Sequence, residues 1–111
     1  MAPLEGYADM IEEILCDRAR FYSSPQEFRT LLAFDRDHGQ FLLIDEGWSG
    51  YRRIHRVWAH VELRDDKVWI HEDGTEEGIA NLLLSASVPQ DHIVLAFQSP
   101  SQRLATDFAT A

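Results

Sequence analysis

The sequence predicts an α+β domain with an N-terminal helix, an antiparallel β-meander of about four strands, a second helix and a short final strand. Three patterns support this prediction. Apolar residues recur at helical spacing up to residue 22, short β-type runs bounded by turns follow, and the hydrophobic period changes from two to about 3.6 within Lys67–Leu83. The 111 residues, 45% of them hydrophobic, suffice for one core, and no linker divides them. We therefore expect a single domain, residues 1–111.

The first helix is expected from about Leu4 to Phe21 or Tyr22. Its acidic residues lie between apolar positions spaced three and four apart, as in an amphipathic helix, and Ser23-Ser24-Pro25 should end it. Cys16 falls at the edge of the apolar stripe and is interpreted as a packed, inert thiol. The stripe consists of Leu4, Tyr7, Ala8, Ile11, Ile14, Leu15 and Arg18.

Two strands are expected next, over Phe28–Asp35 and Gln40–Asp45, with a turn at Arg36–Gly39 between them. Both strands carry apolar residues on both faces. This pattern favours a sheet that is covered twice, by helices on one face and by another subunit or a partner protein on the other.

Gly47–Gly50 is the next expected turn, and a long strand from about Tyr51 to Arg64 should follow it. A hairpin then leads into Lys67. A two-residue loop at Asp65-Asp66 would be a strained primed turn, because neither residue is glycine, so a slightly longer loop stays open. With the short loop, the facing pairs would be Arg64 with Lys67, Leu63 with Val68, Val61 with Ile70, and His60 with His71.

The second helix should begin at Thr75 as N-cap and end near Ala86, before Val88-Pro89. Glu76 and Glu77 would then lie in the first helical turn, where the helix dipole favours negative charge. After a turn at Pro89–His92, the apolar run Ile93–Phe97 is expected to form a strand, which makes a strand–helix–strand crossover. In the tail, Leu104 and Phe108 could each dock on the core.

Charge and composition exclude several classes of protein. Ten Lys and Arg against nineteen Asp and Glu leave a net charge of −9, which disfavours tight DNA binding by the protein alone. A single cysteine, Cys16, cannot form an internal disulfide. Neither a targeting segment nor a membrane span is visible, so we expect a cytoplasmic protein.

The chain contains none of the strong catalytic or cofactor motifs, so no enzyme activity and no cofactor are expected. Only His60 and His71 gain proximity from the hairpin register. The simpler interpretation is a histidine pair at the surface or in an interface. The alternative is that the two histidines form part of a metal site with Glu62 and Glu72 beside them. A usual structural zinc site needs four ligands, and spacing supplies no third or fourth, so we expect no metal.

One region is both basic and aromatic, which distinguishes it in an acidic chain. Nucleic acid is one possible partner, but Trp, Tyr and Arg are enriched at protein interface hot spots, which favours protein contact. The alternative for Trp69 is a core position on a sheet face covered by the first helix. We therefore expect an oligomer or heteromer whose interface includes Trp48, Tyr51, Arg52, Arg53 and Trp69.

Motifs along nearly the whole chain give it a family resemblance. The central Asp73-Gly-Thr-Glu-Glu-Gly-Ile-Ala block is specific, and the other motifs are Asp35 with His38, Gly47-Trp48, Arg52-Arg53, Lys67-Val-Trp-Ile-His, Val88-Pro89, Asp91-His-Ile-Val, Ala96-Phe97, Ser99-Pro100 and Thr106-Asp-Phe-Ala. With these motifs the chain resembles the XisI family of fdxN element excision controlling factors. It departs from the pattern after Ala109, where Thr110 stands in place of an expected Val.

The resemblance implies a small α+β protein that acts with a companion, XisH, and a serine recombinase in the programmed excision of a DNA element in cyanobacteria. It implies no catalytic residues, since the recombinase carries the DNA chemistry. XisI-like genes also pair with XisH-like genes alone, and XisH-like proteins look nuclease-like. The resemblance thus allows an antitoxin-like inhibitor as an alternative to an accessory recombination factor.

A third class, a small enzyme or metal protein, would need a convergent polar site that the sequence does not show. A neighbouring recombinase gene would favour excision control, and a lone XisH-like gene would favour inhibition.

Overall fold

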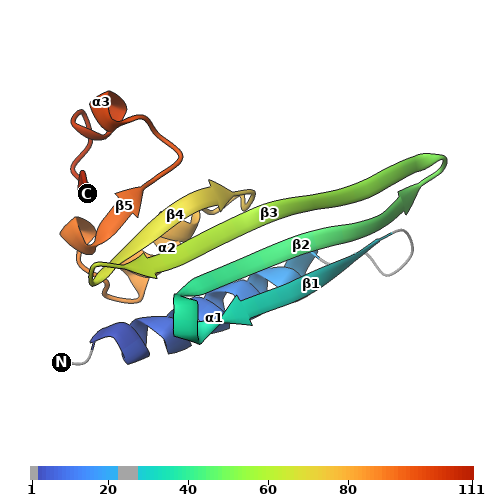
Figure 1. Cartoon of the computed structure of the whole chain (residues 1–111), viewed down its shortest axis with the longest axis horizontal. Helices are drawn as coiled ribbons and strands as arrows, with labels where there is room; N and C mark the ends of the chain where they lie inside the picture. The colour runs from blue at the N-terminus through green and yellow to red at the C-terminus, as the bar shows by residue number, and fades with distance from the viewer. Residues whose placement is uncertain (1–2, 23–27) are drawn as a thin grey trace.

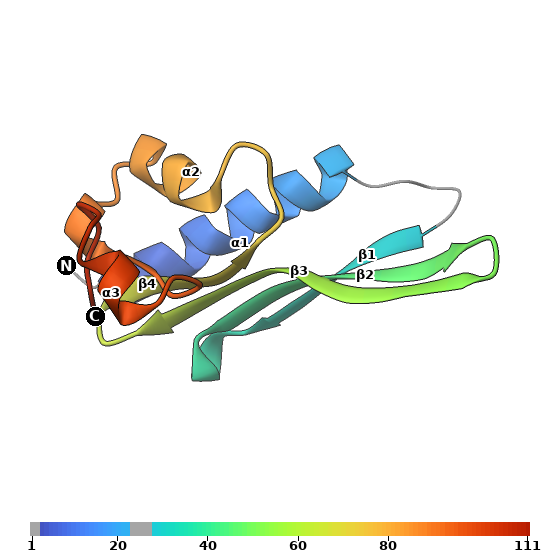
Figure 2. The same ribbon diagram turned by 90° about the horizontal axis from the view of Figure 1, so that it is seen from above.

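A computed structural model describes residues 3–22 and 28–111. A five-stranded sheet in the order β1-β2-β3-β4-β5 has α1 and α2 on one face (Figures 1 and 2). Neighbouring strands are antiparallel except for β4 and β5, which are parallel. The predicted α+β class is confirmed. The elements are α1 Pro3–Tyr22, β1 Phe28–Asp35, η1 Arg36–His38, β2 Gln40–Ser49, β3 Arg52–Arg64, β4 Lys67–Asp73, α2 Ile79–Ser85, η2 Gln90–His92, β5 Ile93–Leu95 and α3 Pro100–Arg103.

Helix α1 matches its prediction within one residue at each end. Its apolar stripe faces the sheet, where burial of these side chains stabilises the helix more than intrinsic propensity does. The predicted stop at Ser23-Ser24-Pro25 lies outside the described residues. The buried positions of the stripe are Ala8, Ile11 and Leu15, and Ala19 beyond it is buried as well.

Strand β1 confirms its predicted bounds, but β2 is longer than expected. The predicted turn at Gly47–Gly50 is wrong, because Gly47 is paired on both sides, with Phe28 and with Ile54. The turn consists of Gly50 and Tyr51 alone, and Gly50 provides a positive φ of 63°. The pairing partners of Gly47 lie far away in sequence, so a local pattern does not reveal them.

The predicted turn after β1 is the 3-10 helix η1, which Asp35 caps by accepting a hydrogen bond from the His38 amide. Gly39 ends it with a φ of 66°. A Cβ at Gly39 would lie 2.5 Å from the Leu63 carbonyl oxygen, and the Gly39 carbonyl accepts a hydrogen bond from the Leu63 amide. Glycine is therefore required where η1 approaches β3.

The β3–β4 hairpin has the two-residue loop at Asp65-Asp66, with φ values of 55° and 63°. A primed turn forms without glycine because Asp is one of the few other residues that tolerate the left-handed region. The predicted pairs from Arg64 with Lys67 to Val61 with Ile70 are confirmed. The pairing of His60 with His71 is wrong. An irregularity between His60 and Val61 makes Glu72 the partner of His60.

Helix α2 begins at Ile79, four residues after the predicted N-cap Thr75. The Asp73 carboxylate accepts hydrogen bonds from the Thr75 amide, the Thr75 hydroxyl and the Ile79 amide, so it organises the preceding loop. Glu76 and Glu77 therefore lie before the helix instead of in its first turn. The predicted end near Ala86 is confirmed.

The final strand is shorter than expected, Ile93–Leu95 in place of Ile93–Phe97, and it pairs parallel to β4. The tail forms the one-turn helix α3 and then returns to the sheet, where Ala109 bridges to Val94. Phe108 packs against the core as expected, whereas Leu104 is 75% exposed and does not dock.

The core lies between the sheet and the two helices, α1 and α2 (Figure 2). The distal ends of β2 and β3 extend beyond α1 as an arm (Figure 1). Within the described ranges 3–22 and 28–111, no helix is long and apolar enough to cross a membrane.

Candidate protein-interaction site

The tip of the arm carries four of the five predicted interface residues. Trp48, Tyr51, Arg52 and Arg53 are all exposed. The Arg53 guanidinium lies 5.4 Å from the centre of the Trp48 ring, which is within cation–π range. Large aromatic rings and an Arg on a projecting arm are residue types that bind other proteins.

Glu46 orders the basic side chains of the arm. Its carboxylate forms ion pairs with Arg29 of β1 at 2.8 Å and with Arg53 of β3 at 2.9 Å. The hydrogen bonds from Arg29 and then Arg53 lower the pKa of Glu46, so it stays ionised. Exposed ion pairs contribute little stability, so their main effect here is to hold Arg53 beside Trp48.

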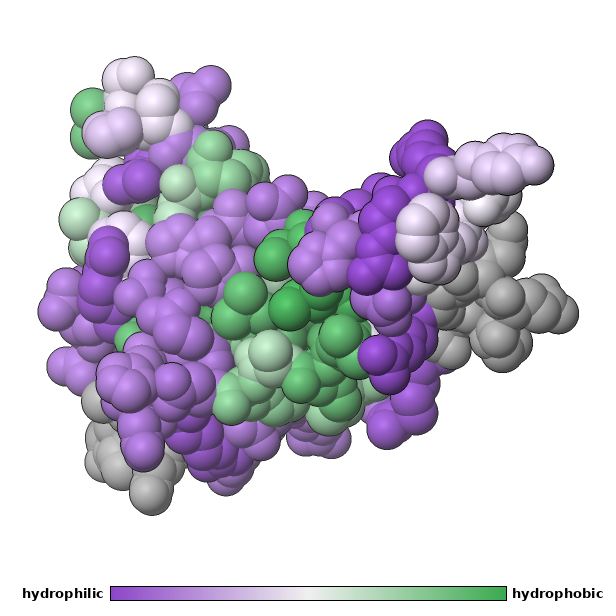
Figure 3. Space-filling view, turned by 45° about the vertical axis from the view of Figure 1, so that its right-hand side comes forward, coloured by the Kyte–Doolittle hydropathy of each residue, from purple (hydrophilic) through white to green (hydrophobic). Residues whose placement is uncertain are grey.

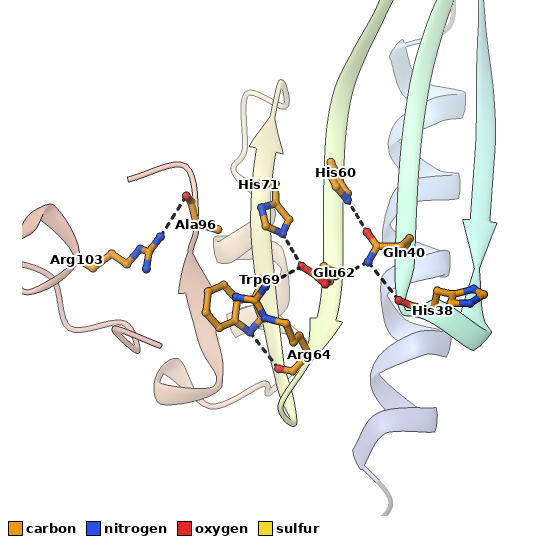
Figure 4. Close-up of polar contacts among 9 residues, drawn as sticks. All are labelled: His38, Gln40, His60, Glu62, Arg64, Trp69, His71, Ala96 and Arg103. Atoms are coloured by element: carbon orange, nitrogen blue, oxygen red, sulfur yellow. Dashed lines mark hydrogen bonds and ion pairs between the residues drawn. The ribbon is translucent and has the colours of Figure 1, made fainter. Parts of the chain in front are cut away.

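Trp69 does not lie with the other four residues. It is buried on β4, and its indole N–H donates to the Arg64 carbonyl at 3.0 Å. The Arg64 guanidinium stacks 3.7 Å from the centre of its ring, and Arg103 of the tail lies 5.8 Å away (Figure 4). The sequence also allowed a core position for Trp69 on the sheet face covered by the first helix, and the structure differs from that alternative too. Trp69 pairs across to Glu62 and Val94, on the sheet face opposite the helices.

This face, which α1 and α2 leave uncovered and which we call the open face, carries an apolar row along the middle of the long strands. Leu31, Ile44 and Val57 face each other across β1, β2 and β3, and Ala33 pairs with Leu42 in the next row. All five are partly or largely exposed. Figure 3 shows the hydrophobic side chains gathered there, with hydrophilic side chains on both sides.

A polar network adjoins the apolar row on the open face (Figure 4). His60 Nε2 lies 2.7 Å from Gln40 Oε1, and the Gln40 amide donates to Glu62 at 3.2 Å. The other Glu62 oxygen lies 2.8 Å from His71 Nε2. Burial raises the pKa of Glu62, but hydrogen bonds from His71 and Gln40 outweigh it and lower the pKa overall.

The structure brings the two histidines together as expected, yet each has a protein partner for its Nε2 atom. Among the described residues, no group of three or more His, Cys, Asp and Glu side chains could hold a metal. An open hollow of about 550 Å³ lies between Arg36–Gly39 and Leu63–Asp66, and its lining mixes both charges without a nucleophile–base pair.

The sequence pattern identifies Leu31 and Leu42 among the apolar residues of two strands that are apolar on both faces, but it does not assign Ile44 and Val57 to one row. The signal was present, since both strands read as apolar on both faces. The sequence did not indicate which face the helices would leave open, because that depends on how α1 crosses the sheet.

Comparison with known proteins agrees with this fold. The XisI family model, described as XisI protein, matches residues 1–110. A crystal structure of a XisI-like protein from Anabaena variabilis has 30% identity and a TM-score of 0.92, covering 97% of this chain and 99% of that one. The chain therefore belongs to the XisI family.

A second crystal structure is named fdxN element excision controlling factor XisI, also from Anabaena variabilis. It is 33% identical to this chain with a TM-score of 0.87, and the match covers 98% of this chain and 99% of that one. No curated protein matches the chain.

Proposed function

We propose that this chain is a non-enzymatic accessory factor that controls the excision of a DNA element through contacts with other proteins. The observation that carries the proposal is the 33% identity, over 98% of the chain, to a protein named fdxN element excision controlling factor XisI. The proposed partners are an XisH-like protein and a serine recombinase, which would carry out the DNA strand chemistry.

The exposed groups support a role in protein contact. The tip of the arm presents Trp48 and Tyr51, and each such ring can bury about 150–250 Å² in a complex. The arm's basic residues are few, and the chain as a whole carries −9, so we propose that DNA is reached through the partners.

The test is an excision assay in cells that hold the element, the recombinase, the XisH-like gene and this chain. Excised junctions should fall when the chain is omitted and when Trp48 and Tyr51 are both replaced by Ala. The matched control is Leu104→Ala, since Leu104 is also exposed but lies in the tail. Unchanged excision without the chain would contradict the proposal.

A DNA mobility-shift assay tests the indirect route to DNA. The purified protein should show no sub-micromolar binding to duplex DNA at moderate salt, because few phosphate contacts are available to it. Tight binding by the chain alone would show that it acts on DNA directly.

The strongly acidic charge also supports a second candidate, an antitoxin-like inhibitor of a nuclease-like XisH-type partner, because an acidic protein is suited to cover a basic, DNA-acting surface. Expressing the partner alone would then damage DNA and stop growth, and co-expression of this chain would restore growth. Growth that is the same with and without this chain would exclude the inhibitor.

A further inference from the structure

The open face has an apolar centre and two ends of opposite net charge. Its centre is the row of Leu31, Ile44 and Val57 with Ala33 and Leu42 beside it. Helices cover the other face of the same strands, so these side chains remain partly or largely exposed, with Val57 at 40%. Exposed apolar groups gathered on one face mark an interaction surface.

Charged residues at the arm end of the open face are mostly basic. The strand register places Arg29, Glu46 and Arg53 on the open face there, whereas Arg52 and Arg56 pair with Ser49 and Asp45 on the helix side. At the opposite end the register places Asp35 and Glu62 on the open face with Arg64 and Lys67, and the β3–β4 loop there adds Asp65 and Asp66. One end is therefore net positive and the other net negative.

We propose that the open face joins two copies of this chain, packed face to face about a two-fold axis that passes near Ile44. Face-to-face sheets keep their strand directions within about 30° of each other. The axis lies between the two sheets and runs across the strands at the middle of β2. It places the basic arm end of each copy over the acidic turn end of the other. The apolar row of each copy covers that of its partner.

The open face is complementary to itself, and this property favours a second copy of the chain as its binding partner. In a two-fold interface the same patch meets itself, so its centre must be apolar or self-pairing and its ends must exchange opposite charges. The open face has both properties. The overall charge of −9 does not prevent pairing, because charges more than about 8 Å apart are largely screened at physiological salt. The inference does not depend on the proposed role in excision.

The size of the face suits a dimer. A specific interface buries about 800 Å² per partner, and this chain exposes 6697 Å² in all. The contact would cover roughly one eighth of the surface, and the faces of β1, β2 and β3 extend along their whole length from the arm to η1.

Light scattering and sedimentation of the purified protein test this proposal at about 50 µM. The expected mass is twice 12.8 kDa. Val57→Lys should weaken association at least tenfold, because it places a charge in the apolar centre. Leu32→Lys is the matched control. Leu32 is similarly exposed, at 48%, but pairs with the buried Leu43 on the helix side, so its replacement should change association less than twofold.

A cross-link distinguishes a second copy from any other partner and does not depend on a disruptive variant. In a Cys16→Ser background, Ile44→Cys should form a disulfide dimer in mild oxidant, because a residue beside the two-fold axis meets its own copy. Leu32→Cys in the same background should stay monomeric. A wild-type protein that is monomeric at this concentration, equal effects of the two Lys variants, or equal cross-linking of the two Cys variants would each overturn the proposal.

Discussion

The imidazole rings of His60 and His71 lie 4.7 Å apart between their centroids, with their planes inclined by 32°. The two residues are not paired across the strands, because the irregularity after His60 shifts the register, and yet their rings meet on the open face. Protonating both rings would place two positive charges side by side. Glu62 faces His71 and limits this repulsion.

This contact predicts that stability depends on pH. Partial burial, and then the neighbouring His71, lower the pKa of His60 below its ordinary 6.5, although Glu62 and Glu72 oppose the shift. As pH falls through 6.5, the unfolded chain binds a proton that folded His60 resists, so the free energy of unfolding falls. The loss continues until pH passes the folded pKa. Urea unfolding between about pH 7.5 and 5.5 should show this fall.

His60→Gln is the control for that series, since it removes the titrating group. The variant should lose less stability than the wild type over the same pH range. Parallel curves for the two proteins would show that His60 titrates as it does in the unfolded chain.

Replacing Trp69 should impair folding more than association. Trp69→Ala empties a buried site beneath Arg64, and such a change costs about 3–5 kcal/mol of unfolding free energy. Trp48→Ala at the exposed arm tip should cost less than about 1 kcal/mol. Urea unfolding curves measure both changes. A Trp69→Ala protein as stable as the wild type would indicate that its pocket collapses.

The Asp73 carboxylate should contribute to the stability of the loop before α2. It accepts bonds from Thr75 and from the first amide of the helix, so Asp73→Ala should lower the unfolding free energy by about 1–2 kcal/mol. The adjacent and exposed Glu72→Ala is the control and should change it by less than about 0.5 kcal/mol. Equal losses in the two variants would contradict the capping role.

Chelator should leave the melting temperature unchanged, and elemental analysis should find less than one zinc per chain. The reason is that the Nε2 atoms of His60 and His71 contact Gln40 and Glu62, and the described residues form no cluster of metal ligands. A structural metal contributes directly to folding free energy. A drop of several degrees with chelator would assign His60 and His71 as ligands.

Local patterns in the sequence were enough to predict α1, β1, the β3–β4 hairpin and the end of α2. Each depends on residues near one another along the chain, such as the helical stripe from Tyr7 to Arg18 or the loop at Asp65-Asp66. The arm-tip residues could also be chosen from the sequence, because large aromatics next to a glycine turn tend to be exposed at the turn.

Tertiary structure alone decided the rest. Gly47 is a strand residue because β1 and β3 both pair with it, and α2 starts at Ile79 because Asp73 provides the cap from the end of β4. Trp69 is buried because Arg64 and the returning tail lie against it. Which apolar face remained open depended on where α1 and α2 packed. These outcomes rest on contacts between distant segments, and the energy of such contacts is absent from any local window of the sequence.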